Sequence, residues 1–293
     1  MKGKSPLKPF INVSFGPIIA LISLQEVTAM EYETLAVERR DGIALVTMNR
    51  PEKLNALDRR MCREIIRLRE DMENDANVRA VILTGAGRAF SSGGDIQDLM
   101  VRLVNETVKE KEETIRLADQ AFLHLKMMEV PTIAAVNGVA AGGGCCLAMA
   151  CDIRIAMEDA KFALVFVHRG LSGADAGATY FLPRIVGSGW AAELLYTGDF
   201  IDAHQAEKLG LVNHVVAPQD LMEASWALAR RIADGPAVGM QMTKRALGRS
   251  IMSGLADQLD FEAAVQTICF QTEDHQEGVR SFIEKREPQF KGR

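Results

Sequence analysis

The chain has 293 residues, of which 48% are hydrophobic and 25% are charged, and its formal net charge is −5. This length allows a large buried core, and the composition is that of an ordinary globular protein. No basic stripe with interleaved aromatic residues is present, so we expect no nucleic-acid partner. Five cysteines without a CxxC pair support neither a disulfide framework nor a zinc site, and reduced thiols in the cytoplasm are the expectation.

Residues 1–29 differ in character from the rest of the chain. A basic start, an apolar stretch and the small residues "VTA" have the layout of a secretory signal. The apolar stretch is short and is interrupted by Asn12, Ser14 and Pro17, so we do not expect it to span a membrane. Our prediction for residues 1–29 is a disordered N-terminal extension, or a segment upstream of a working start at Met30; a signal peptide is the alternative.

From residue 30 onward, strand patterns alternate with helix patterns. Two alternating apolar stretches around Arg-Asp-Gly in residues 31–49 predict a β-hairpin. Apolar residues at spacings of three and four predict a helix over 57–72. Further strands are predicted in "VRAVILTGAG", "VPTIAAVNG" and "DIRIA", and further helices over 98–128 and from the glycines near 143 to about 150. This alternation predicts an α/β domain with parallel strands over residues 30–235.

The pattern changes around Pro236. The segment "DGPAVG" interrupts the alternation, and a helix-rich tail follows from Met240 to about Ile283. We therefore predict a C-terminal helical lobe over residues 236–293, with a role in oligomerisation as one interpretation.

Two glycine-rich turns carry the clearest chemical signal. Each follows an apolar strand and precedes a helix: "SSGGD" at 91–95 and "GGGCC" at 142–146. The first N–H groups of a helix have no partner within it, and glycine lets another group approach the backbone closely. The N–H groups of Gly94 and Gly143 are thus candidates for an oxyanion hole, worth roughly 3 to 4 kcal/mol per donor. A phosphate cradle fits the motifs poorly, and two merely tight turns remain the alternative.

Six segments together resemble the enoyl-CoA hydratase/isomerase, or crotonase, superfamily. They occur in order from residue 49 to the C-terminus: "NRPEKLNAL", "RAFSSGGDI", "PTIAAVNGVAAGGGCCLAMACDIRIA", "LPRIVG", "AEKLGLVNHVV" and "FIEKREPQFKGR". The resemblance implies an α/β fold built as a crotonase-like spiral of ββα units, with a C-terminal helical trimerisation lobe. It also implies a homotrimer or a dimer of trimers.

The resemblance further implies an acyl-CoA thioester as substrate, with coenzyme A as part of the substrate and no separate metal or redox cofactor. The thioester oxygen would be held by the N–H groups of Gly94 and Gly143. Coenzyme A would lie along the residues Lys53, Ala56, Arg88, Ala89, Ser91 and Ser92. Lys285 and Lys291 would reach a phosphate; a solvated charged tail is the alternative for these two lysines.

The chain departs from the family pattern at both glutamates that hydratases use for water activation and proton transfer. Cys146 and Phe166 stand at those two places. Asp175 lies nine residues before Arg184. The resemblance implies an acidic residue at this place in the isomerases, thioester hydrolases and dehalogenases of the superfamily. We expect Asp175 to act as acid and base, with a helix N-cap as the alternative role. Cys146 is a second candidate, although a buried packing role suits a cysteine in an apolar helix.

Three functions are therefore open at the level of sequence. The first is a cytoplasmic enzyme that hydrates or isomerises an enoyl-CoA through an enolate bound by Gly94 and Gly143. The second is an acyl-CoA hydrolase or thioesterase that uses Asp175 or Cys146. The third is a non-catalytic subunit that binds acyl-CoA or assembles with active relatives.

Overall fold

The structure, a computed structural model, describes residues 32–293 apart from the side chain of Met100. Predictions for residues 1–29 lie outside the described residues. Residues 32–293 form one compact unit, and the division at residue 236 stays a prediction.

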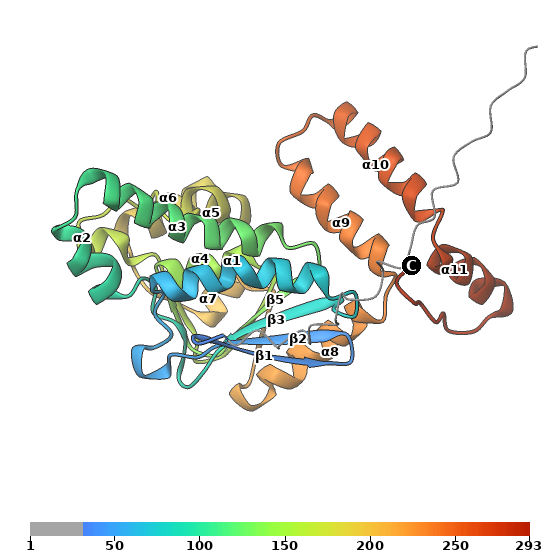
Figure 1. Cartoon of the computed structure of the whole chain (residues 1–293), viewed down its shortest axis with the longest axis horizontal. Helices are drawn as coiled ribbons and strands as arrows, with labels where there is room; N and C mark the ends of the chain where they lie inside the picture. The colour runs from blue at the N-terminus through green and yellow to red at the C-terminus, as the bar shows by residue number, and fades with distance from the viewer. Residues whose placement is uncertain (1–31) are drawn as a thin grey trace, which may run out of the picture. The chain divides into compact units, whose positions relative to one another are not determined.

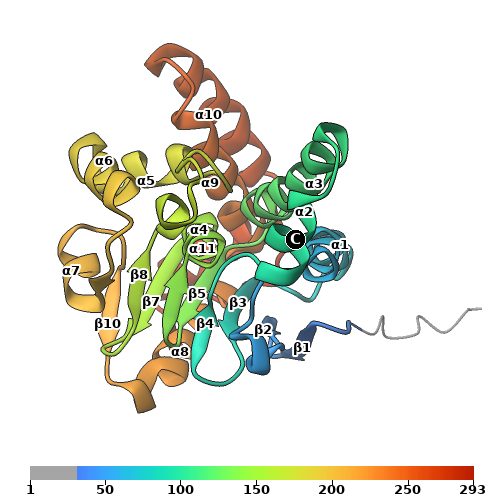
Figure 2. The same ribbon diagram turned by 90° about the vertical axis from the view of Figure 1, so that its left-hand side faces the viewer.

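A six-stranded sheet forms the centre of this unit (Figures 1 and 2). Its order is β1 (Leu35–Arg40), β2 (Ile43–Met48), β3 (Ala80–Gly85), β5 (Thr132–Val136), β7 (Ile153–Met157) and β10 (His214–Val216). The β1–β2 hairpin is antiparallel and the other pairs are parallel, which confirms the predicted hairpin and parallel strands. A second sheet has the order β4 (Ala89–Ser91), β6 (Val139–Ala141), β8 (Lys161–Ala163) and β9 (Ile201–Asp202), with β9 antiparallel to β8.

Both faces of the central sheet are covered. All six residues of β3 are buried, as expected of a parallel strand between two layers. Val81 and Leu83 belong to the core shared with α1 (Arg59–Asn74), α3 (Val108–Met127) and α4 (Gly143–Ala150). Ala80 and Ile82 face the other way and pack with α8 (Leu221–Ala233). The remaining helices of this region are α5 (Ala178–Val186), α6 (Ser188–Thr197) and α7 (Ala203–Lys208), with short turns η1 (Pro51–Lys53), η3 (Val165–Arg169) and η4 (Pro218–Asp220).

The single helix predicted over residues 98–128 is wrong in its first part. A π-helical turn, η2 (Ile96–Val101), leads into the short α2 (Arg102–Val104). The helix is then interrupted, and α3 begins at Val108. Thr107 and Glu110 form a capping box, in which each side chain accepts a bond from the other residue's N–H. This box starts a new helix, because it satisfies two backbone donors that a continuous helix would have paired internally.

Three helices end the chain: α9 (Ala237–Ser250), α10 (Leu255–Cys269) and α11 (Glu273–Glu284). The helix-rich tail is thereby confirmed. A buried ion pair joins α9 to the sheet region: Lys244 Nζ lies 2.7 Å from Asp152 Oδ2 and donates to the Val130 carbonyl at 2.8 Å. Asp152 also binds Lys126 and accepts from the N–H and hydroxyl of Thr132.

Candidate active site

One cavity of about 300 Å³ contains three of the predicted site residues. Gly94, Gly143 and Asp175 all line it. The other lining residues are mostly apolar and come from the turn before α1, η2, α2, α3, η3 and the loop before α5: Leu57, Leu99, Leu103, Thr114, Ile115, Ala118, Phe122, Phe166, Leu171, Ser172, Ala174 and Ala176. Two glycine turns that lie 49 residues apart in the sequence therefore converge on one apolar space.

The two turns pack directly on each other. A Cβ added to Gly93 would lie 2.6 Å from the Ala141 carbonyl oxygen and 3.2 Å from the Gly143 nitrogen. A Cβ on Gly144 would lie 2.2 Å from the Ser91 carbonyl oxygen. Side chains at both positions are thus excluded by backbone atoms. The sequence suggests that glycine is needed in these turns so that a substrate oxygen can approach. At Gly93 and Gly144, glycine is needed because the two turns contact each other.

The amides of Gly94 and Gly143 remain free to donate. Leu57 brackets Gly94: its N–H donates to Gly93 O at 2.8 Å and its carbonyl accepts from Asp95 N at 2.8 Å. Neither Gly94 N nor Gly143 N has a hydrogen-bond acceptor among the atoms of residues 32–293. Gly143 is the first residue of α4, so the positive end of that helix lies behind its N–H.

Arg50 fixes the Gly94 turn from outside the cavity. Its guanidinium donates to Asp95 Oδ2 at 2.9 Å and to the Ala56 carbonyl at 2.6 Å, and lies 3.3 Å from Asp58 Oδ2. Burial raises the pKa of Asp95, but the hydrogen bond from Arg50 and two backbone N–H bonds outweigh it and hold the pKa below its usual value. Asp95 caps η2, because its side chain accepts hydrogen bonds from the N–H groups of Gln97 and Asp98. Sequence reasoning missed Arg50, whose only signal is its place in "NRPEKLNAL".

Asp175 is half-buried at the cavity wall. Burial raises the pKa of its carboxyl, and a hydrogen bond from the Ala176 N–H opposes the shift. The alternative role as a side-chain helix cap is wrong, because Gly177 is the N-cap of α5 and no side chain bonds there. A partly desolvated carboxyl in an apolar space has the environment of a general base.

Cys146 and Phe166 occupy the two glutamate places in different ways. Phe166 lines the cavity, whereas Cys146 is fully buried beneath it in α4 and is not part of the wall. Burial raises the pKa of the Cys146 thiol well above its usual value, and the nearby carboxylates add to this effect. A neutral, enclosed thiol is a poor nucleophile.

The segments predicted to hold coenzyme A lie side by side. Ser91 Oγ donates to Asn55 O at 2.8 Å, Asn55 Nδ2 donates to Ala89 O at 2.8 Å, and Ser92 N donates to Leu54 O at 2.9 Å. Of the six predicted residues, Lys53 and Arg88 have exposed side chains, Ser92 is half-buried, and Ala56, Ala89 and Ser91 are buried. Lys285 ends α11 and Lys291 lies in the C-terminal segment; both are exposed and neither lines the cavity.

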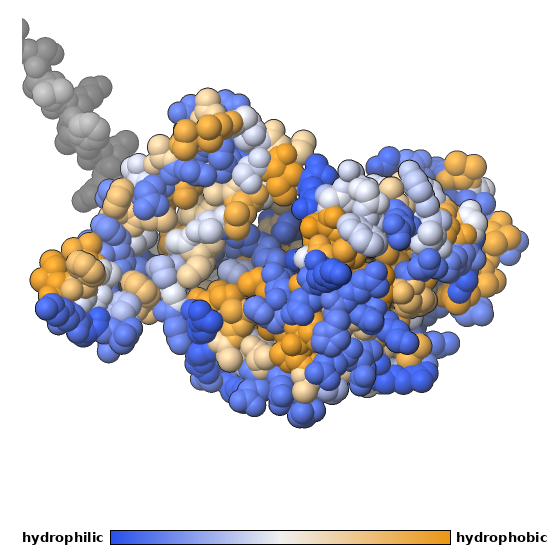
Figure 3. Space-filling model, turned by 180° about the vertical axis from the view of Figure 1, so that it is seen from behind, coloured by the Kyte–Doolittle hydropathy of each residue, from blue (hydrophilic) through white to orange (hydrophobic). Residues whose placement is uncertain are grey.

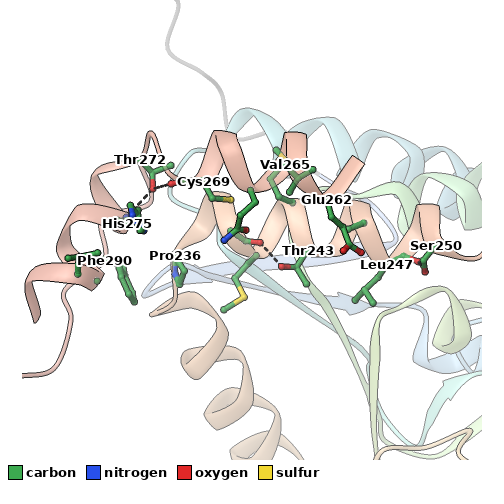
Figure 4. A pocket seen from close by; sticks show the side chains of 18 of the residues that line it. Pro236, Thr243, Leu247, Ser250, Glu262, Val265, Cys269, Thr272, His275 and Phe290 are labelled. Carbon is green, nitrogen blue, oxygen red and sulfur yellow. Dashed lines mark hydrogen bonds between the residues drawn. The ribbon is translucent and has the colours of Figure 1, made fainter. Parts of the chain in front are cut away.

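A larger groove of about 1,000 Å³ lies between α9, α10 and α11, and Figure 4 shows the side chains that line it. Its wall is largely apolar, with Leu247, Val265, Phe282 and Phe290 among its residues. Gln258, which is 8% exposed, also lines it, and its Oε1 has no hydrogen-bond partner within the described part of the chain. No helix between residues 32 and 293 has the length and apolarity required to cross a membrane.

Known proteins resemble this chain over nearly its whole described length. The enoyl-CoA hydratase/isomerase family model matches residues 38–293. A short-chain-enoyl-CoA hydratase of Clostridium acetobutylicum is 39% identical over 258 residues, covering 88% of this chain and 97% of that protein. A 1,2-epoxyphenylacetyl-CoA isomerase of Escherichia coli is 36% identical, covering 90% and 100%. The crystal structure of a putative enoyl-CoA hydratase from Streptomyces coelicolor A3(2) superposes with a TM-score of 0.87 at 36% identity, covering 98% of this chain and 100% of that one. The chain belongs to the enoyl-CoA hydratase/isomerase family.

Proposed function

We propose that this protein isomerises or hydrates an enoyl-CoA thioester, and that double-bond isomerisation is its main reaction. The observation that carries this proposal is the 300 Å³ cavity, in which two unpaired amide N–H groups and one carboxyl with a raised pKa share an apolar space. Gly94 and Gly143 would bind the thioester oxygen, and Asp175 would move the proton.

The chemistry follows from the order of charge movement. The Asp175 carboxylate takes a proton from C2 of a 3-enoyl-CoA, and the electron pair of that C–H bond moves to the thioester oxygen, which becomes an enolate. The two amide donors stabilise this charge more than they stabilise the neutral carbonyl. Return of the proton from Asp175 to C4 shifts the double bond to C2–C3. The apolar lining limits access of water to the enolate.

Isomerisation ranks ahead of hydration because of the residues at the two glutamate places. Hydration needs a base for the water and a proton donor for C2, whereas isomerisation needs one group that takes and returns a proton. Asp175 is the one carboxyl among the lining residues. At one of the two glutamate places, the wall has the apolar side chain of Phe166. The relatives named above include both a hydratase and an isomerase, so this ranking rests on the residues of the cavity. A thioesterase that uses Cys146 is disfavoured by the burial of that thiol, and a hydrolase that uses Asp175 is the second candidate.

Coenzyme A would lie against the segments around Lys53 and Arg88, whose exposed cations suit its phosphates. Lys285 and Lys291 would add charge from the C-terminal region. The proposed proton transfers need neither a metal nor a redox cofactor, and the proposed location is the cytoplasm.

We also propose assembly as a homotrimer or a dimer of trimers through the C-terminal helices. Large apolar side chains are exposed on them, as the orange surface in Figure 3 shows, and Phe282 is 85% exposed. Exposed apolar surface of this extent is unusual on a monomer. The unpaired Gln258 Oε1 in the groove would accept a hydrogen bond from a second copy.

The test of the reaction is turnover of the full chain with crotonyl-CoA, longer trans-2- and trans-3-enoyl-CoAs, and cyclic dienoyl- and β-keto-acyl-CoAs. Products are separated by chromatography and identified by mass spectrometry. A changed retention time at unchanged mass establishes isomerisation, and a mass gain of one water establishes hydration. Asp175→Asn is expected to lower kcat about 10²- to 10⁴-fold, the size of a general-base contribution.

Asp159→Asn is the matched control, because Asp159 is exposed in the turn after β7 and does not line the cavity. Equal activity of Asp175→Asn and wild type would remove Asp175 from the mechanism. Saturable acyl-CoA binding without turnover of any substrate would favour the non-catalytic subunit.

A further inference from the structure

One buried hydroxyl within residues 32–293 has no hydrogen-bond partner, and it belongs to the wall of the proposed active site. Thr114 is 6% exposed and lines the cavity from α3. Every other buried serine or threonine hydroxyl in this range donates to a carbonyl or carboxylate oxygen: Thr34, Thr84, Ser91, Thr132, Ser225 and Ser281. Buried polar groups in proteins are nearly always paired, so the exception at Thr114 needs an explanation.

The helix itself does not pair this hydroxyl. A threonine inside a helix commonly donates to the carbonyl four residues earlier, as Thr243 does in α9 and Thr267 does in α10, both at 2.8 Å. Thr114 makes no such bond to the Glu110 carbonyl. Its Oγ1 is not completely enclosed by other atoms, and the cavity is the space that Thr114 lines. The hydroxyl is therefore available to a group inside the cavity.

Thr114 lies away from the thioester end of the cavity. Gly143 marks that end, and a Cβ added there would lie 3.4 Å from Phe122 Cζ. Thr114 precedes Phe122 by eight residues on α3, which corresponds to about 12 Å along the helix axis. Ala118 lies midway between them, and the three residues share the face that lines the cavity. An acyl group whose thioester is bound at Gly94 and Gly143 would extend along this face toward Thr114.

Polar side chains are scarce on the cavity wall. Among the described residues, only Thr114, Ser172 and Asp175 bring one to it. Asp175 has the proposed role in proton transfer, and Ser172 is exposed, with its Oγ accepting from Ala174 N at 3.0 Å. A hydrocarbon chain along α3 would cover the Thr114 hydroxyl and leave it unpaired, which costs the desolvation free energy of that group.

We propose that Thr114 is a substrate-binding residue that selects acyl-CoAs carrying an oxygen substituent, a hydroxyl or a carbonyl, on the acyl chain away from the thioester. A threonine hydroxyl both donates and accepts, so it pairs with either group. The apolar residues of the wall hold the chain, and this one hydrogen bond fixes its length and orientation. The inference rests on the proposed function, because it takes the cavity as the place where the acyl group of a CoA thioester binds.

The preference is tested by titration calorimetry of the full chain with two matched series of ligands. One series is saturated acyl-CoAs of four to ten carbons, and the other is the same chains with a terminal hydroxyl. Neither series has the double bond that the proposed reaction moves, so binding is measured without turnover. At the length that reaches Thr114, the hydroxylated ligand should bind wild type about tenfold more tightly than its unsubstituted counterpart.

Thr114→Val removes the hydroxyl and keeps the branched shape. The preference should disappear in this variant, mainly because the unsubstituted ligands bind more tightly once no hydroxyl is left unpaired. Thr114→Ser should retain the preference. Thr267→Val is the matched control, because Thr267 is exposed in α10 and bonds within its own helix; it should bind both series as wild type does.

Stability gives a second readout that separates substrate binding from a structural role. Thr114→Val loses no hydrogen bond within the protein, so its midpoint of urea unfolding should equal or exceed that of wild type. A lower midpoint, with equal binding of both series by wild type, would assign the hydroxyl to an internal water and overturn the proposal.

Two further outcomes separate this proposal from the proposed function. Wild type that binds both series equally at every length, or a preference that survives in Thr114→Val, would overturn the role of Thr114 while acyl-CoA binding still supports the proposed function. Wild type that binds neither series would overturn the proposed function, and the selection by Thr114 with it.

Discussion

Gly144 shows, at the scale of a single residue, why the two glycine turns stay together. Its Cα faces the Ser91 carbonyl, and an added Cβ would come within 2.2 Å of that oxygen. Backbone atoms on both sides of this contact belong to secondary structure, β4 and α4, so they move only with their elements. The separation of the Gly94 and Gly143 amides therefore depends on the absence of a side chain at residue 144.

We predict that Gly144→Ala lowers the free energy of unfolding by about 3 kcal/mol, at the upper end for overpacking of a buried contact, and lowers turnover as well. Gly189→Ala is the control, because nothing lies within 4 Å of its added Cβ in α6. That control should change the free energy of unfolding by less than about 0.5 kcal/mol. Denaturant unfolding of both variants measures the difference, and equal stability would show that the turns separate at low cost.

Much of the site at this scale could be predicted from residue types, and some could not. The glycines after apolar strands identify Gly94 and Gly143 as donors, because the first N–H groups of a helix are unpaired within it and glycine leaves them accessible. Arg50 gives no such signal, because its ion pairs with Asp58 and Asp95 depend on how the chain folds around the Gly94 turn. The buried position of Cys146 confirms the packing role that a cysteine in an apolar helix suggests.

At the scale of elements, the joint between α9 and the sheet region depends on Asp152. Burial raises the pKa of Asp152, but Lys244, Lys126 and the Thr132 N–H outweigh it and hold the pKa below its usual value. Burial also lowers the pKa of the Lys244 ammonium, an effect that Asp152 opposes. Removal of the carboxylate would leave a buried cation without an anion. The strand and helix patterns predict both elements, but they do not predict that these residues pair.

We predict that Asp152→Asn costs about 3 kcal/mol near neutral pH, the size expected for breaking a buried pair. A carboxyl whose pKa is lower in the folded state contributes stability above its unfolded pKa and loses it as pH falls through the folded value. The difference between wild type and Asp152→Asn should therefore shrink in acid, below the usual aspartate range. Urea unfolding at several pH values tests this, and a difference independent of pH would contradict the ionic origin.

At the scale of the whole molecule, the C-terminal helices expose more apolar surface than their own packing requires. Phe282 in α11 and Leu255 in α10 are 85% and 76% exposed. The sequence predicts these helices but not what they contact, because a periodic apolar stripe is the same for an internal core and for a subunit interface.

We predict that Phe282→Asp shifts the protein from the assembled state toward monomer, because a charge cannot be buried unpaired in an apolar interface. Light scattering after size-exclusion chromatography measures the mass. Tyr196→Asp in α6 is the control: Tyr196 is also exposed, at 79%, but lies outside the C-terminal helices. A monomeric wild type, or a variant of unchanged assembled mass, would show that this surface is not the interface.

The two proposed oxyanion donors are main-chain atoms, and this has a consequence for engineering. A backbone N–H persists when neighbouring side chains are exchanged. Mutation at the positions that supply acids and bases should therefore leave the binding of the thioester oxygen unchanged. A directed-evolution library at Cys146, Phe166 and Asp175 would vary proton transfer while retaining the backbone donors that stabilise the enolate. New reactions on acyl-CoA substrates should therefore need few substitutions, because the backbone donors for the enolate charge stay in place.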